Sequence, residues 1–433
     1  MWLKSLHVEN FRGFEKLDVT FDEHVTLLVG GNGAGKTAIL DAIATAMNPF
    51  VAALDERAHS GLQSRDTRRI VFEHGTPPTR DLQPQLPMIV GASAILPGRP
   101  EGQTWSREKW IPDAGENEHL LKELRGTANL LSSDVRRGIP VALPVFAHYG
   151  VQRLRPHAAP SGDDASLGNR FDGYHESVDI AVSRPRLFNW LWLKTLEEVQ
   201  EWQTNPSYRH PQLRAVFAAI ESCVDGVSDL SVSLKDHELR LRIGERFQAF
   251  EMLSAGYQNV VALVADLARR AAVLNPQYGE RAAFETPGVV LVDEIELHLH
   301  PKWQRTVIGS LRRSFPKMQF ILTTHSPQVL STVEREQVRL FEDNRLVAAR
   351  GFVEGRSSNE LLEDIFGVPA RPPATKAALD ELFKLIDDGD YASACTKLSA
   401  LETRLGRDDG DIVRARWILE SEAGSEPAAP IAS

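Results

Sequence analysis

The stretch that decides the fold is Gly30-Gly31-Asn32-Gly33-Ala34-Gly35-Lys36-Thr37 (GGNGAGKT). It matches G-x-x-x-x-G-K-[ST], a phosphate-binding loop that joins a strand to a helix. The context fits, because the apolar run Val25–Val29 precedes it and apolar residues at helical spacing follow in Ala38–Met47. Glycines let backbone N–H groups turn toward phosphate oxygens, and the helix adds its positive end. The sequence therefore predicts a nucleotide phosphate site.

Two side chains of this loop have a clear chemical purpose. We expect Lys36 to place its charge on the β- and γ-phosphates, and Thr37 to offer its hydroxyl to Mg²⁺, which prefers oxygen ligands. A chance glycine turn is the alternative, and the flanking strand and helix disfavour it. The loop residues expected to contact ATP are Gly30, Asn32, Gly33, Ala34, Gly35, Lys36 and Thr37.

A second signal is a predicted buried strand, Gly288–Val292, which ends in Asp293 and Glu294. This is the Walker B pattern, in which Asp293 holds Mg²⁺, partly through water, and Glu294 polarises the attacking water as a general base. A solvated acidic turn would explain the dipeptide alone, but not beside a phosphate-binding loop. Residues 38–292 separate the two motifs, so a large insertion lies between them, unlike in ring-forming AAA+ motors and small GTPases.

Two further segments predict contacts with phosphate. Leu253–Gln258 (LSAGYQ) precedes a predicted helix, and Ser254 and Gly256 at a helix N-terminus make a second anion site. A simple helix cap by Ser254 is the alternative. Thr323–Pro327 (TTHSP) ends the strand after Asp293, which places His325 within reach of the γ-phosphate and the water. A lone histidine is more often structural, but this position favours a functional one.

Three weaker segments complete the candidate site. Glu296–Pro301 (ELHLHP) alternates acidic and imidazole side chains, but the set of metal ligands is incomplete for a metal centre. Asn10–Phe14 (NFRGF) supplies Arg12, although its phenylalanines are equally explained by packing around a turn. Tyr149–Arg153 (YGVQR) follows a predicted core strand and supplies Gln152.

Together these motifs resemble the ABC-type ATPase head of the SMC/RecF/OLD group, the AAA_21-like proteins. The resemblance implies an α/β P-loop NTPase fold, with a mixed or parallel sheet flanked by helices, a β-rich lobe and a helical C-terminal region. It also implies ATP and Mg²⁺ as cofactors. In that group two subunits sandwich two nucleotides, and each signature (here LSAGYQ) meets the other subunit's γ-phosphate. A homodimer or higher homo-oligomer is therefore expected.

The same resemblance assigns roles to the weaker segments. It implies that Arg12 approaches the nucleotide, that Gln152 senses Mg²⁺ and that His325 is the switch histidine. Glu296–Pro301 looks like the D-loop, which crosses the dimer interface. The expected catalytic residues are then Glu294 and His325, and the expected metal-site residues are Thr37, Asp293 and Gln152.

Three other segments are similar to PtuA-type ATPases of Septu and retron anti-phage systems. They are Leu143–Gly150 (LPVFAHYG), Asn169–Tyr174 (NRFDGY) and Ser357–Gly367 (SSNELLEDIFG). His148 stands where that family would have an aromatic residue. This resemblance implies an ATPase that gates a nuclease effector, such as an HNH protein, in anti-phage defence. A RecF-like DNA repair clamp and a nucleotide-gated scaffold with little turnover remain as alternatives.

Composition limits the class of protein. The chain has 433 residues, of which 42% are hydrophobic and 25% charged, with a net charge of −10 and two cysteines. These values are ordinary for a globular protein, exclude a disulfide scaffold or zinc ribbon, and fit a reducing cytoplasm. No apolar run is long enough to predict a membrane span.

The sequence predicts three parts of the chain: an ATPase head at 1–345, a helical region at 346–420 and a disordered tail at 421–433. Within the head we expect a β-rich elaboration at 51–140 and a helical and hairpin insertion at 155–250.

The sequence also bears on nucleic acid. An acidic chain is not a natural coat for DNA or RNA, although a contact is possible if its arginines converge on one face. These small clusters are Arg65, Arg68, Arg69, Arg136, Arg137, Arg153 and Arg155. Residues 357–420 are predicted to be helical, so the strand-borne carboxylates of a TOPRIM nuclease are not expected. We interpret the acidic groups Asp387–Asp390 and Asp408–Asp411 as helix caps and solvated loops.

Overall fold

The chain divides into two compact units, Met1–Leu361 and Leu362–Ser433. The boundary falls inside α10 (Ser358–Asp364), whereas the sequence division was placed after residue 345. Val353 and Leu361 are both buried, which explains why the first unit continues beyond 345. This computed structural model describes residues 1–55, 57, 61–74, 79–111, 117–152, 154–155, 169–178, 182–348 and 353–423.

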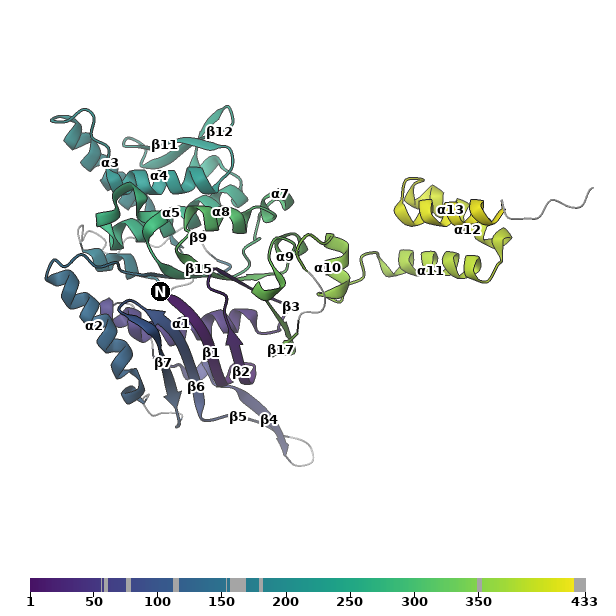
Figure 1. Cartoon of the computed structure of the whole chain (residues 1–433), viewed down its shortest axis with the longest axis horizontal. Coiled ribbons are helices and arrows are strands. Elements are labelled where there is room, and N and C mark those ends of the chain that lie inside the picture. The colour runs from purple at the N-terminus through teal and green to yellow at the C-terminus, as the bar shows by residue number, and fades with distance from the viewer. Residues whose placement is uncertain are drawn as a thin grey trace, which may run out of the picture. The chain divides into compact units, whose positions relative to one another are not determined.

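A six-stranded sheet forms the centre of the first unit (Figure 1). Its order is β17-β16-β3-β15-β14-β8, and all neighbours are parallel except β16 and β17. Every residue of β3, β8, β14 and β15 is buried, which is why these strands appear in the sequence as continuous apolar runs. The strands are β3 (Val25–Gly30), β8 (Val145–Tyr149), β14 (Gly288–Val292), β15 (Met318–Thr324), β16 (Val338–Glu342) and β17 (Arg345–Val347).

A second, antiparallel sheet lies on the other side of helix α1 (Lys36–Leu54). Its order is β2-β1-β6-β7, with bounds β1 (Trp2–Phe11), β2 (Phe14–Thr20), β6 (Met88–Leu96) and β7 (Arg99–Lys109). The helix contacts β1 and β6 of this sheet and β3, β8 and β15 of the parallel sheet. Trp105 and Arg107 of β7 donate hydrogen bonds to main-chain carbonyls of α1, at 2.8 and 2.7 Å. Helix α1 is the described helix long and apolar enough to cross a membrane, and burial between two sheets accounts for its composition.

The opposite face of the parallel sheet carries helices, with a small sheet beyond them (Figure 1). Helix α5 is buried along most of its length, and α4 packs on α5 and α8. The bounds are α3 (Arg184–Trp202), α4 (Pro211–Cys223), α5 (Ala255–Leu274), α6 (Ala282–Glu285), α8 (Val307–Ser314), α9 (Pro327–Leu330), β11 (Val227–Ser233), β12 (Glu238–Ile243) and β13 (Arg246–Ala249).

A buried ionic cluster joins α5 to β8. Asp266 accepts hydrogen bonds from Tyr149 of β8 and from Arg269 and Arg270 of its own helix, at 2.7 to 3.1 Å. Arg270 also donates to the main-chain carbonyl of Gly173, in the short helix Arg170–Tyr174. Burial alone would raise the pKa of Asp266, but the charges of Arg270 and Arg269 outweigh it and hold the pKa well below its usual range. The cluster therefore fixes the helix that follows LSAGYQ against the strand that precedes Gln152.

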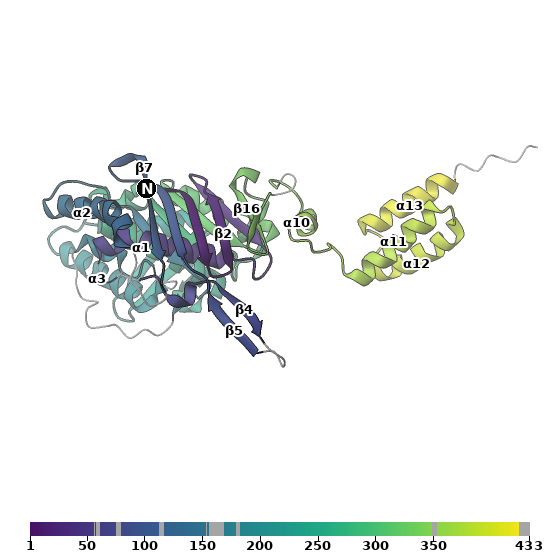
Figure 2. The same cartoon turned by 90° about the horizontal axis from the view of Figure 1, so that it is seen from below.

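The region 51–140 differs from the expected β-rich elaboration. Besides its strands it contains α2 (Lys122–Arg136), whose buried residues Leu124, Ala128 and Leu131 recur at helical spacing. The strands β4 (Arg69–His74) and β5 (Thr79–Pro84) form a separate two-stranded hairpin, which projects from the unit in Figure 2. After the Walker B strand the chain forms two short helices, α7 (Pro301–Gln304) and α8.

The second unit is a bundle of three helices, α11 (Pro373–Asp387), α12 (Tyr391–Leu405) and α13 (Gly410–Ala423), labelled in Figure 2. It has its own apolar core, formed by Leu379, Leu382, Ile386, Ala394, Leu398, Leu401, Ile412, Ala415 and Leu419. Asp390 accepts from the Ser393 N–H and caps α12, as expected for that acidic group. Residues 421–423 continue α13, whereas the sequence predicted disorder from 421; the rest of that tail lies outside the described residues.

Candidate functional site

The phosphate-binding loop begins at the C-terminal end of β3, an inner strand of the parallel sheet. Gly35 has φ of 92°, and a Cβ there would lie 2.4 Å from the Phe14 ring and 2.8 Å from the Asn344 Oδ1. A side chain at 35 would therefore be strained and would collide with its neighbours. Asn32 and Gly33 are exposed, and Ala34 is buried beneath them. The tip of the loop is therefore exposed to solvent. The NFRGF segment and the β16–β17 turn pack against the loop at Gly35.

Lys36 is buried at the start of α1 and points back into the loop. Its Nζ donates to the main-chain carbonyls of Gly30 and Gly31, both at 2.9 Å. Burial lowers the pKa of Lys36, and the carboxylates of Asp293, Glu294 and Glu296 oppose this effect. The ammonium group is therefore held inside the loop by weak neutral acceptors, which an anionic phosphate oxygen can replace.

Thr37 and the Walker B pair are brought together from opposite ends of the chain. Thr37 Oγ1 donates to Asp293 Oδ2 at 2.9 Å, and Thr323 Oγ1 donates to Asp293 Oδ1 at 2.5 Å. The same Thr323 hydroxyl accepts from the Glu294 N–H at 2.7 Å. Thr37 and Asp293 offer only oxygen donors, which fits Mg²⁺ and disfavours softer metals. These residues are therefore the ones that could hold Mg²⁺.

The histidine and the acidic residues after β14 form one linked group. Glu294 has φ of 47°, an uncommon backbone conformation for a residue with a side chain. Glu296 accepts from Thr324 Oγ1 at 2.8 Å and from the His325 N–H at 2.5 Å. Glu296 thus positions the Thr324–His325 segment. His300 accepts from the Lys302 N–H and caps α7, so the Glu-His alternation is used for structure.

The LSAGYQ segment forms the start of α5. Ser254 is its exposed N-cap residue, and the Gln258 side chain donates to the carbonyls of Phe250, Glu251 and Leu253 at 3.0 to 3.3 Å. Gly256 lies against the D-loop, because a Cβ there would be 2.4 Å from the His298 carbonyl oxygen. The exposed end of α5 and the D-loop are therefore packed together within one subunit.

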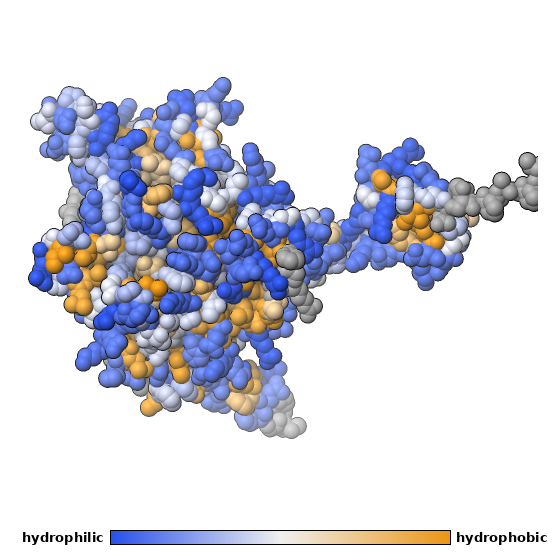
Figure 3. All heavy atoms as spheres, in the orientation of Figure 1, coloured by the Kyte–Doolittle hydropathy of each residue, from blue (hydrophilic) through white to orange (hydrophobic). Residues whose placement is uncertain are grey.

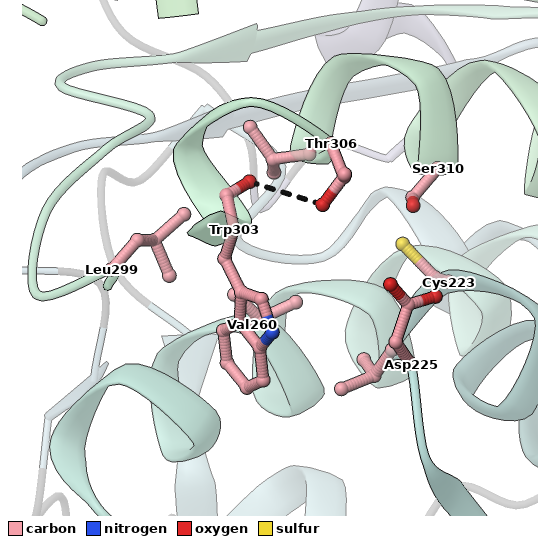
Figure 4. A pocket seen from close by; sticks show the side chains of 9 residues that line it. Cys223, Asp225, Val260, Leu299, Trp303, Thr306 and Ser310 are labelled. Carbon is pink, nitrogen blue, oxygen red and sulfur yellow. Dashed lines mark hydrogen bonds between the residues drawn. The ribbon is translucent and has the colours of Figure 1, made fainter. Parts of the chain in front are cut away.

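A small pocket lies behind this contact (Figure 4). Leu299 of the D-loop, Trp303 and Val260 of α5 line it, and Thr306 donates to the Trp303 carbonyl. Cys223 also lines the pocket, and burial raises the pKa of its thiol to about 12. The thiol is therefore protonated at neutral pH and is not a reactive group.

The family resemblance implies that two further residues, Arg12 and Gln152, act at the nucleotide. Arg12 donates hydrogen bonds to Asp41 of α1 and, at 3.0 Å, to Asp66. These contacts are with carboxylates and not with the glycines of the phosphate-binding loop. Burial lowers the pKa of Arg12, but Asp41 and Asp66 outweigh it and raise the pKa. Gln152 is exposed in the turn after β8, at the sheet edge where Asp293 lies.

Several residues of the site were missed in the sequence. The sequence motifs gave no role to four residues that make the contacts described above: Thr323, Asp41, Asp66 and Asn344. Thr323 is part of TTHSP, but only His325 of that segment was given a role. Arg68 pairs with Glu15 at 3.3 Å, and Arg153 lies outside the described residues.

Comparisons with known proteins agree with this geometry. A family described as "AAA domain, putative AbiEii toxin, Type IV TA system" matches residues 193–331, and an "AAA domain" family matches residues 5–80. The chain is 27% identical to the retron Ec83 probable ATPase of Escherichia coli, over 96% of this chain and 86% of that protein. It is 26% identical to the retron Vc95 probable ATPase of Vibrio cholerae serotype O1 biovar El Tor, over 79% and 73%.

A third relative comes from another system. The chain is 24% identical to the Septu protein PtuA of Bacillus thuringiensis, over 89% of both proteins. The matched families cover both halves of the site, the phosphate-binding loop in one and the signature, Walker B and histidine segments in the other. The chain is therefore a P-loop ATPase with AAA_21- and AAA_23-type domains, homologous to the retron ATPases and to Septu PtuA.

Proposed function

We propose that the chain is a Mg²⁺-dependent ATPase that works as an ABC-type dimer and gates a separate effector in anti-phage defence. The observation that carries the ATPase part is the chain of contacts Thr37–Asp293–Thr323–Glu294, which joins the phosphate-binding loop to the Asp293 carboxylate and to the main-chain N–H of Glu294. The loop and the carboxylates lie at one edge of one parallel sheet, where nucleotides bind in open α/β folds.

Each residue then has a role in hydrolysis. Lys36 moves from the loop carbonyls to the β- and γ-phosphates of ATP. Bound Mg²⁺ would neutralise charge on the same phosphates, held at Thr37 and Asp293 with Gln152 nearby. Glu294 takes the proton of the attacking water as general base, and His325, positioned by Glu296, contacts the γ-phosphate.

The position of the signature supports the proposed dimer. Ser254 is exposed at the N-terminus of α5, a helix of 20 residues, and helix N-termini favour anions. We infer that it meets the γ-phosphate bound by a second subunit. The contact between Gly256 and the His298 carbonyl then lets closure at the signature act directly on the D-loop.

The effector role rests on the relatives and on the second unit. The retron ATPases and Septu PtuA match this chain over most of its length, which supports a similar place in a defence system of the cytoplasm. The second unit exposes large apolar side chains, Val413 and Trp417 on α13, and apolar surface is visible on it in Figure 3. We propose that this unit docks a partner, such as an HNH nuclease.

Mixing two inactive variants tests the dimer. Lys36→Ala removes the charge on the phosphates, and Ser254→Arg blocks the signature while leaving the loop of its own subunit intact. A mixed dimer has one composite site in which both elements are intact, so we expect partial recovery of ATPase activity. Activity that needs no second subunit, from protein shown to be monomeric by light scattering, would refute the sandwich.

The base and the defence role have their own tests. Glu294→Gln should bind ATP, accumulate as the ATP-bound dimer and lose roughly 10²- to 10⁴-fold in kcat, the typical contribution of a general base. The native locus should lower phage plating, and Lys36→Ala within it should restore plating. Undiminished protection by the Lys36→Ala locus would show that nucleotide does not gate the effector.

A further inference from the structure

His148 is a buried polar side chain that the proposed mechanism does not use. It lies on β8 and is 2% exposed. Among the described residues its Nε2 atom has no hydrogen-bond partner. A buried polar atom left in this way destabilises the fold unless another arrangement of the protein satisfies it. The neighbours of this imidazole therefore indicate what it can do.

The register of the sheet shows which way His148 faces. His148 pairs with Leu291 of β14, and the next residues along, Tyr149 and Val292, also pair. Alternate side chains of a strand share a face, so His148 is on the same face as Asp293, which contacts Thr37 of α1. Tyr149 is on the opposite face, where its hydroxyl donates to Asp266 of α5. His148 therefore faces the helix that follows the phosphate-binding loop.

On that helix Asp41, whose charge acts on His148, is part of an ion pair. Asp41 is one helical turn after Thr37, so both lie on the same side of α1. Its partner is Arg12, which also contacts Asp66. Burial lowers the pKa of His148; the carboxylates of Asp41 and Asp293 oppose this, and Arg12 adds to it. The imidazole is therefore neutral near pH 7 and has one N–H to donate.

We propose that His148 is a positioning residue for Arg12, because its Nε2–H becomes the donor to Asp41 when Arg12 turns from Asp41 to the nucleotide. The inference rests on the proposed function, and it takes from the family resemblance the expectation that Arg12 approaches the nucleotide. The exchange gives Asp41 a partner in both arrangements and satisfies the buried imidazole in the second. It therefore lowers the free energy needed to release Arg12.

The test compares His148→Phe, which keeps the ring and removes the donor, with His148→Gln, which keeps a donor at a similar reach. Loss of a hydrogen bond to a charged group predicts a rise of roughly tenfold or more in the KM for ATP for His148→Phe, with kcat little changed. His148→Gln should restore the KM. In an Arg12→Ala background, His148→Phe should have no further effect, because there is no arginine to release.

His210→Phe is the matched control. His210 is also buried and has a ring nitrogen without a hydrogen-bond partner among the described residues, but it lies at the start of α4. We expect a changed Tm there and an unchanged KM. If His148→Phe does not yield folded protein, His148→Asn takes its place, because its amide ends near the position of the imidazole Nδ1 and places no donor at that of Nε2.

The outcomes separate this inference from the proposed function. A wild-type KM in His148→Phe, failure of His148→Gln to restore it, or an equal effect in the Arg12→Ala background would overturn the positioning role while ATP hydrolysis stands. Wild-type protein that binds ATP no better than Lys36→Ala would overturn the proposed function, and the positioning role with it.

Discussion

Replacing Thr323 by valine removes one hydroxyl that holds the Asp293 carboxylate and the main chain of Glu294, with almost no change in shape. The hydroxyl donates to Asp293 and accepts from the Glu294 N–H, and Thr323 is fully buried. The bond to a charged group is worth about 1.5–3 kcal/mol. If Glu294 is fixed correctly only with this hydroxyl in place, the loss falls on the transition state. We then expect kcat to fall by roughly 10- to 150-fold.

The assay is steady-state ATP hydrolysis at saturating ATP and varied Mg²⁺, with thermal unfolding measured in parallel. Thr26→Val is the matched control, because Thr26 is equally buried in β3 and its hydroxyl accepts from the Asp22 N–H at 2.8 Å, remote from the phosphate-binding loop. Both variants should lower Tm, and Thr323→Val alone should lower kcat. Equal kcat in the two variants would refute the claim that Thr323 organises the carboxylates.

Three further predictions follow from single contacts. Lys36→Ala should abolish ATP binding in a calorimetric titration, and undiminished affinity would contradict the loop assignment. Asp266→Asn should lower the free energy of unfolding by about 3–5 kcal/mol at neutral pH, measured by denaturant unfolding. Because the pKa of Asp266 is depressed in the folded state, the difference in unfolding free energy between wild type and variant should be full above about pH 4 and shrink as the pH falls further. Gly256→Ala should push on the His298 carbonyl and cost about 1–3 kcal/mol, whereas Gly309→Ala, where a Cβ meets nothing, should not destabilise.

The elements of the fold that sequence reasoning finds best are those whose burial is uniform. Gly288–Val292 and Val25–Val29 are predicted because both faces of these strands are covered by other layers. Helix α2 was missed, although Leu124, Ala128 and Leu131 have helical spacing, because the strand candidates elsewhere in 51–140 favoured a β-rich elaboration for the whole region. Local composition in that region competed with periodicity, and packing against α1 decided the outcome.

The site follows a similar division. Residues whose chemistry requires a fixed type, such as Lys36 and Glu294, are visible in a motif. Residues that act by holding others are not, because their role depends on contacts between distant segments. Asp66 is such a residue, since its bond to Arg12 exists only after β1 and the segment following α1 have come together. No local pattern could have identified that pair.

The motifs can lie far apart in the sequence because neighbouring strands of the sheet bring them together. Strands β3, β15, β14 and β8 are adjacent and parallel, so the segments that follow them emerge at one edge. Those segments are the phosphate-binding loop, His325, the Walker B pair and Gln152. The chain between β3 and β8 returns to the sheet through α1 and the antiparallel sheet, so residues can be added there without moving the edge. A site built from the segments that follow four strands therefore tolerates insertions between those strands. It keeps its geometry as long as the pairing register of the four strands is unchanged.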